Sequence, residues 1–130
     1  MTESIPYGLS QEERVRKKLE EEFGMPLHKK RIQVVEGVEH EFDFVSEDGS
    51  IIGEVKTSGA GRSGLTHNRF QTIFGDISRD CLLLLAQRRA KKRMFVLTDE
   101  TVYKRFQGSQ YGKAAQALGI DIRLVQADSG

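Results

Sequence analysis

The stretch EFDFVSEDGSIIGEVKT, residues 41–57, decides the fold of this chain. Two runs of alternating apolar and polar residues flank Asp48-Gly49, a dipeptide typical of tight β-hairpin turns. If these two residues form the loop, Asp43 lies directly opposite Glu54 on the neighbouring strand. Like charges that face each other across a strand pair are destabilising, so this register needs a compensating partner.

The hairpin is predicted to have an apolar face and a mixed face, because side chains alternate between the two faces of a strand. We expect the apolar face to pack on a helix, with Gly53 leaving room opposite Phe44. Lys56 lies two residues beyond Glu54 and should project from the same face, about 7 Å along the strand. The apolar face carries Phe42, Phe44, Ile51 and Val55, and the mixed face carries Glu41, Asp43, Val45, Ile52, Glu54 and Lys56.

A cation between the two facing acids would make them tolerable. Hard oxygen ligands such as Asp43 and Glu54 select Mg²⁺ or a similar ion such as Mn²⁺. An ammonium at Lys56 can hold or help to deprotonate a water near the metal, while the metal stabilises charge that develops on a phosphate. These groups together make a site for phosphodiester hydrolysis. The alternative is a structural or interaction domain whose hairpin charges are simply solvated.

The whole-chain properties restrict the class of protein. The 130 residues are expected to form one domain, 1–130, and 38% hydrophobic with 30% charged residues is typical of a soluble globular protein. A net charge of +1 means that affinity for an anionic polymer must come from local patches. The single cysteine, Cys81, excludes an internal disulfide and suits a reducing compartment. The N-terminus lacks the pattern of a signal peptide and no apolar run approaches membrane-spanning length, so we expect a cytoplasmic protein without a membrane partner.

The sequence predicts an α-β-β-β-α-β-α-β order, which is an α/β domain with a mixed sheet. Ser10 and Glu13 form a capping-box pattern that starts the first helix, and Gly24 ends it. The predicted strands are Leu27–Val35, Val38–Ser46, Ile51–Thr57, Arg93–Leu97 and Ile120–Val125. The predicted helices run from Gln11 to Gly24, from Asn68 to Arg89, from a cap at Thr98 or Asp99 to Phe106, and over Lys113–Leu118, with a Gly- and Ser-rich loop at Ser58–Thr66.

The hairpin resembles the PD-(D/E)xK nuclease superfamily, because Asp43 is followed eleven residues later by Glu54-Val55-Lys56 between two helices. The resemblance covers roughly residues 11–97 and implies a restriction-endonuclease-like α-β-β-β-α-β core, with a C-terminal helix and strand added. It also implies that Asp43 and Glu54 are metal ligands and that Lys56 is the catalytic lysine. Phe42 stands where the family motif has proline, a residue without a chemical role.

Many members of the superfamily add an acid from the first helix. At 100° per residue, Glu12 and Glu22 fall on the apolar stripe of this helix, so each is a candidate. Glu12 resembles the early helix acid of small Holliday-junction resolvases. Solvated helix glutamates are the alternative, so Glu12, Glu22 or neither could join the site.

Three groups of residues are candidates for contacts with a nucleic-acid backbone. The Gly-rich loop and the following helix start could track phosphates, although a Gly-rich match is weak and an ordinary connection is the alternative. Cations near residues 88–93 would equally complement the end of a helix. The candidates are Arg62, Asn68, Arg69 and Gln71 near the loop, Lys29, Lys30 and Arg31 on the first strand, and Arg88, Arg89, Lys91 and Lys92, followed by Arg93.

The function expected from the sequence is a Mg²⁺- or Mn²⁺-dependent endodeoxyribonuclease acting on double-stranded or branched DNA. Asp43 and Glu54 would hold the metal, Lys56 would position the water and Glu12 would assist. A non-catalytic nucleic-acid-binding module with the same fold is the alternative. Cutting both strands of a duplex needs two sites, so a homodimer is compatible with this hypothesis.

Overall fold

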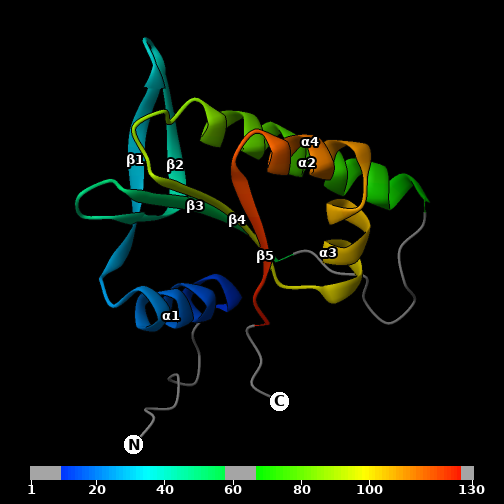
Figure 1. Cartoon of the computed structure of the whole chain (residues 1–130), viewed down its shortest axis with the longest axis horizontal. Helices are drawn as coiled ribbons and strands as arrows, with labels where there is room; N and C mark the ends of the chain where they lie inside the picture. The colour runs from blue at the N-terminus through cyan, green and yellow to red at the C-terminus, as the bar shows by residue number, and fades with distance from the viewer. Residues whose placement is uncertain (1–9, 58–66, 127–130) are drawn as a thin grey trace, which may run out of the picture.

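The computed structural model describes residues 10–57 and 67–126, which form a five-stranded mixed sheet covered by helices (Figure 1). The strand order is β1-β2-β3-β4-β5, with β1, β2 and β3 antiparallel and β3, β4 and β5 parallel. The predicted α/β class with a mixed sheet is therefore confirmed. The elements are α1 (Gln11–Phe23), β1 (Leu27–Val35), β2 (Val38–Ser46), β3 (Ile51–Lys56), α2 (His67–Leu85), β4 (Lys92–Leu97), α3 (Glu100–Gln107), α4 (Gln110–Ala117) and β5 (Ile120–Leu124).

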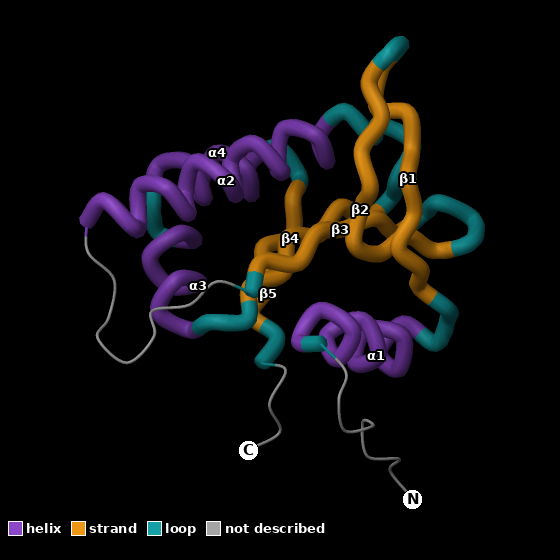
Figure 2. The backbone as a smooth tube through the Cα atoms, turned by 180° about the vertical axis from the view of Figure 1, so that it is seen from behind, coloured by secondary structure: helices purple, strands orange, loops and turns teal. Residues whose placement is uncertain are grey.

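Helices cover the two faces of the sheet unequally, as the front and back views show (Figures 1 and 2). Helix α1 lies on one face, where its buried Val15 and Leu19 pack against a cluster that includes Phe44. Helices α2, α3 and α4 lie on the other face, where Ile73 and Ile77 of α2 belong to the larger core. None of the described helices is long and apolar enough to cross a membrane.

Helix α1 begins and ends where the sequence predicts. The Ser10 side chain accepts a hydrogen bond from the backbone N–H of Glu13, whose carboxylate reaches back to the Ser10 backbone. Gly24 closes the helix in the left-handed conformation at φ 67°, which glycine adopts without the strain of a Cβ.

The register of the central hairpin is also confirmed. Val45 pairs with Ile52, and Phe44 pairs with Gly53. A Cβ at Gly53 would lie 2.1 Å from the Cζ atom of the Phe44 ring, so glycine is required by close packing. In the turn, the Asp48 carboxylate accepts bonds from the backbone of Ser50 and from the hydroxyls of Ser46 and Ser50. These bonds lower the pKa of Asp48 to about 2.

The predicted placement of Phe42 beside Phe44 is wrong. Phe42 packs in the core beneath α2, whereas Phe44 packs beneath α1. The cause is an irregularity in β2: Val45 pairs with His28 of β1, but Phe42 pairs with Lys30, so three steps on β2 match two on β1. Such a β-bulge reverses the alternation of faces and redirects the side chains next to it.

The C-terminal half departs from the predicted boundaries by more than one residue in two places. Helix α2 ends at Leu85 rather than at Arg89, because the backbone N–H groups of Lys91 and Lys92 bond to the carbonyl of Ser50 and draw the chain into the sheet. Helix α4 begins at Gln110 rather than Lys113, since the Ser109 hydroxyl caps it by accepting from the N–H of Gly112. Both helical segments predicted between β4 and β5 are present, so this part of the chain has one helix more than the order α-β-β-β-α-β-α-β counts.

Candidate metal centre

The β2 bulge brings the Asp43 carboxylate onto the neighbouring strand. Its Oδ2 atom accepts a hydrogen bond of 2.8 Å from the backbone N–H of Val55. The carboxyl groups of Asp43 and Glu54 also interact with each other, as expected from the register.

Burial makes this pair of acids electrostatically strained. Glu54 is only 5% exposed. Burial, followed by the charges of Asp43 and Asp80, raises the pKa of Glu54 to about 9. Burial likewise raises the pKa of Asp43 and of Asp80, each from its usual value of 3.8. The site therefore favours neutral acids or a bound cation over three bare carboxylates.

Helix α2 supplies two acids that the sequence analysis does not assign to the site. Asp76 Oδ2 lies 3.3 Å from the Nζ atom of Lys56. The next acid, Asp80, interacts with His40 and Lys56. Because α2 runs antiparallel to β3, four helix residues, about 6 Å, match two strand residues, about 6.6 Å. Asp76 therefore lies beside Lys56, and Asp80 lies beside Glu54, the two neighbouring residues of β3 whose side chains face α2.

His40 of β2 completes the buried group. Its Nε2 atom lies 2.8 Å from Oε1 of Glu54, and its ring stands edge-on to Phe42 at 4.7 Å between centroids. His40, Glu54 and Asp80 each offer a ligand atom, and these atoms all lie within 4.8 Å of one another. Three elements, β2, β3 and α2, thus contribute to one potential coordination sphere.

Of the two helix acids considered, the structure places Glu12 near the predicted site. The Glu12 carboxylate interacts with Asp43 and Glu54, and it forms an ion pair of 3.0 Å with Lys29 of β1. Arg16 contacts both Glu12 and the backbone oxygen of Asp43. Glu22 instead pairs with Arg123 of β5, so it is occupied elsewhere.

The predicted residues Glu12, Asp43 and Glu54 interact with one another, whereas Lys56 contacts Asp76 and is connected to them through Asp80; His40, Asp76 and Asp80 are additional members. A signal for the last two exists in the sequence. Asp76 and Asp80 are four residues apart, and Asp80 lies roughly 60° around the helix from the buried Ile77. An acid pair flanking a core-facing stripe is compatible with a site, but the sequence does not state which strand the helix crosses.

The first-strand cations lie on a mixed-charge ribbon. Lys30 and Arg31 are exposed, but Arg31 pairs across the strands with Glu41, and Lys29 is bound to Glu12. The ribbon formed by β1 and β2 projects from the body of the molecule in both views (Figures 1 and 2). Its cations are accompanied by acids, so it is not a uniformly positive surface.

The cluster at residues 88–93 lies toward the opposite end of β3 from Lys56. Lys92 pairs with Ile51 at the start of β3, roughly 16 Å along the strand from Lys56. Lys92 also contacts Asp121 at 3.8 Å, and Arg93 donates to the carbonyl of Leu85, so both have structural partners. The expectation that the cluster ends a helix is wrong, because α2 stops at Leu85. The exposed members are Arg88, Arg89 and Lys91.

The loop candidates are only partly described. Asn68, Arg69 and Gln71 are exposed in the first turns of α2, beyond the turn that carries Asp76. Arg62 lies outside the described residues. These three residues therefore lie at the N-terminal end of α2, about two turns before Asp76, which contacts Lys56.

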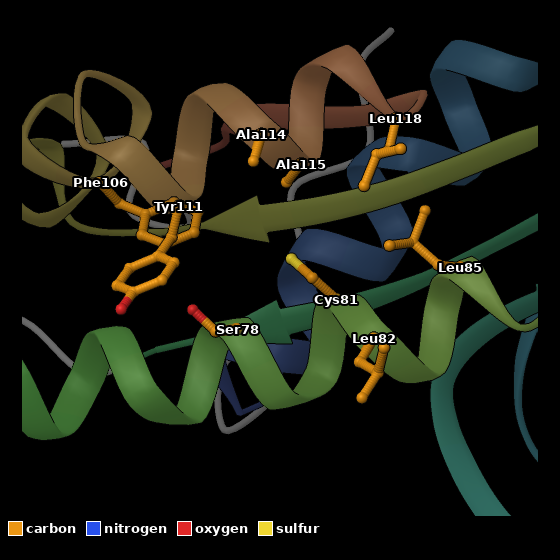
Figure 3. A pocket seen from close by; sticks show the side chains of 9 residues that line it. All are labelled: Ser78, Cys81, Leu82, Leu85, Phe106, Tyr111, Ala114, Ala115 and Leu118. Carbon is orange, nitrogen blue, oxygen red and sulfur yellow. The ribbon is translucent and has the colours of Figure 1, made fainter.

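A separate pocket of about 140 Å³ opens between α2 and α4 (Figure 3). Leu82, Leu85 and Leu118 line it together with the thiol of Cys81, and the sticks show the hydroxyls of Ser78 and Tyr111 near its edge. Burial raises the pKa of Cys81 to about 12, which leaves a poor nucleophile. No carboxylate or cation lines this pocket, so it is chemically distinct from the acidic site.

Comparison of the chain with protein-family models, with curated proteins and with solved structures gives no match.

Proposed function

We propose that this chain is a metal-dependent nuclease that hydrolyses phosphodiester bonds in double-stranded or branched DNA. The observation that carries the proposal is the buried pair Asp43 and Glu54 with Glu12 nearby, together with Asp80, which interacts with both Glu54 and Lys56. The α-β-β-β-α-β order of the first six elements and the mixed sheet support a restriction-endonuclease-like fold and membership of the PD-(D/E)xK superfamily.

The donor set fits a hard divalent cation. Asp43 and Glu54 present carboxylate oxygens to each other, and both carboxyl groups are made unusually hard to ionise by burial. Mg²⁺ and Mn²⁺ prefer such oxygen ligands, so Asp43 and Glu54 would hold the ion. When bound, the ion would stabilise negative charge on a phosphate and on a water-derived nucleophile.

Lys56 is held in position for a role in proton transfer. Its ammonium pairs with Asp76, which also contacts Arg79. The ammonium has no lone pair and cannot ligate a metal, but it can donate a hydrogen bond to a water or a phosphate oxygen. The charge of Glu12 acts on Asp43 and contributes to its raised pKa, and we assign Glu12 an assisting role. We assign Lys56 to the chemical step.

The proposal is tested by incubating the chain with linear, nicked, single-stranded and four-way DNA in Mg²⁺ or Mn²⁺. We expect cleavage by the wild type and a turnover about 10²–10⁴-fold lower for Lys56→Ala, with metal affinity retained. Lys113→Ala, an exposed lysine on α4, is the matched control and should cut normally. Cleavage by Lys56→Ala at the wild-type rate would show that Lys56 has no role in the mechanism.

If the wild type binds DNA in the same assay without cutting any member of the panel, the non-catalytic binding module is the better interpretation. The panel also reports the substrate class, because a branched-DNA enzyme cuts the four-way substrate and spares the linear one. Sedimentation of the chain with and without DNA would show whether two copies assemble, as double-strand cutting requires.

A further inference from the structure

The structure points to a second metal position in addition to the Asp43–Glu54 pair. We infer that His40, Glu54 and Asp80 bind a divalent transition-metal ion in preference to Mg²⁺. The inference rests on the proposed function only in that Glu54 serves both positions. Its own basis is the arrangement of three ligand atoms from β2, β3 and α2, which lie within 4.8 Å of one another.

Asp80 is the first reason to expect a cation. It is half-buried, yet within the described ranges it forms no hydrogen bond or ion pair. The ammonium of Lys56 lies nearby but pairs with Asp76 one turn earlier on α2. A partly buried carboxylate that faces a second carboxylate without a direct partner costs free energy, which a metal ion between them would recover.

Glu54 is the second reason. The side chain is 7% exposed, so water cannot solvate it, and its direct partners are His40 and the acid Asp43. His40 is the cation-forming group in direct contact with Glu54, whereas Lys29 acts on Asp43 and Lys56 and Arg79 act on Asp80 from farther away. Ligation of an ion by neutral His40 would supply two positive charges where protonation of the imidazole supplies one.

The donor chemistry selects the type of ion. Mg²⁺ favours an all-oxygen octahedral environment and dehydrates reluctantly, whereas imidazole nitrogen suits Zn²⁺, Co²⁺ and similar ions. One nitrogen and two carboxylates match the first-row transition ions better than the two carboxylates at Asp43 and Glu54 do. The edge contact with the Phe42 ring restrains the imidazole, so this ligand is oriented before the ion arrives.

Titration of the metal-free full chain with Co²⁺ provides a test that does not depend on DNA cleavage. We expect a visible absorption band that persists in excess Mg²⁺. His40→Ala should weaken Co²⁺ binding by at least about 10-fold, and the near-isosteric Asp80→Asn should do the same. His28→Ala, which removes an exposed imidazole on β1, is the matched control and should leave the titration unchanged.

Circular dichroism reports whether each variant is folded, and Asp80→Asn carries the test if His40→Ala does not fold. Equal Co²⁺ affinity in folded His40→Ala or Asp80→Asn would overturn the inference, as would displacement of Co²⁺ by equimolar Mg²⁺. A strong near-ultraviolet thiolate band would place the ion on Cys81 and would also overturn it. Failure of the proposed nuclease looks different: DNA stays intact while Co²⁺ binding still depends on His40.

Discussion

Replacement of Glu54 by glutamine should make the metal-free protein more stable at neutral and alkaline pH. The buried environment raises the pKa of Glu54 from 4.5 to about 9. In the unfolded chain the carboxyl group ionises above its ordinary value, whereas in the folded protein it keeps its proton until the raised value is reached. Between pH 4.5 and about pH 9, unfolding therefore releases a proton from Glu54, and the free energy of unfolding must fall as the pH rises.

The magnitude follows from the proton balance. One proton per molecule corresponds to about 1.4 kcal/mol for each pH unit, so the wild type would lose at most about 4 kcal/mol between pH 5 and pH 8. Asp43 and Asp80 act in the same direction, because burial raises the pKa of each. Glutamine keeps the shape and an acceptor oxygen for His40 but cannot ionise. We therefore expect Glu54→Gln to match the wild type near pH 4.5 and to exceed it increasingly above that.

The assay is urea unfolding in EDTA at several pH values, with wild type, Glu54→Gln and Glu47→Gln compared in parallel. Glu47 lies exposed in the turn of the same hairpin, so its substitution controls for the loss of a carboxylate as such. Parallel stability curves for the wild type and Glu54→Gln from pH 5 to pH 8 would refute the argument. They would mean that Glu54 is ionised in the folded protein and that His40 balances its charge.

Four further variants test separate parts of the structure. Gly53→Ala should destabilise the fold by about 1–3 kcal/mol or more, since its Cβ would overlap the buried Phe44 ring. Gly75→Ala, which has open space around it on α2, should stabilise the fold by roughly 0.5–1 kcal/mol. Urea unfolding measures both changes. Asp43→Asn should abolish metal-dependent cleavage and raise the metal-free melting temperature, because an amide relieves the contact with Glu54; cleavage at the wild-type rate would contradict the role of Asp43. Double replacement of Arg88 and Lys91 by alanine should flatten the plot of log affinity for DNA against log salt by roughly 0.9 per lost phosphate contact, and an unchanged slope would leave these cations simply solvated.

Local chemistry explains why the hairpin was predictable. Asp48-Gly49 specifies the turn through bonds made within five residues, and Gly53 opposite Phe44 fixes the same register from the strands. The bulge beside Asp43 was not predictable from alternation. Both faces of the sheet are covered by helices, so apolar residues are needed on both, and Phe44 and Val45 are buried on opposite faces in succession.

Helix direction explains the residues that the sequence analysis missed. The spacing of Asp76 and Asp80 shows that they share a side of α2, but it does not show which strand they meet. That depends on the antiparallel path of α2 over β3, which sets Asp76 against Lys56. His40 was missed for a related reason, because its contact with Glu54 depends on the course of β2 before the bulge.

A bound metal ion should offset the electrostatic destabilisation that Asp43, Glu54 and Asp80 cause in the folded protein. Acids are concentrated in the core-facing region between β3 and α2, where packing alone would favour apolar side chains, and such local conflicts are expected at functional sites. An ion that binds only the folded state adds about 2.7 kcal/mol of stability when its concentration is 100 times its dissociation constant. Mg²⁺ or Co²⁺ should therefore stabilise the wild type more at pH 8.5 than at pH 6, because protons compete less strongly for Glu54 as the pH approaches its raised pKa, and should stabilise Glu54→Gln much less. Melting curves at pH 6 and pH 8.5, with and without the ion, measure this difference. Equal stabilisation of both proteins would place the bound ion away from Glu54.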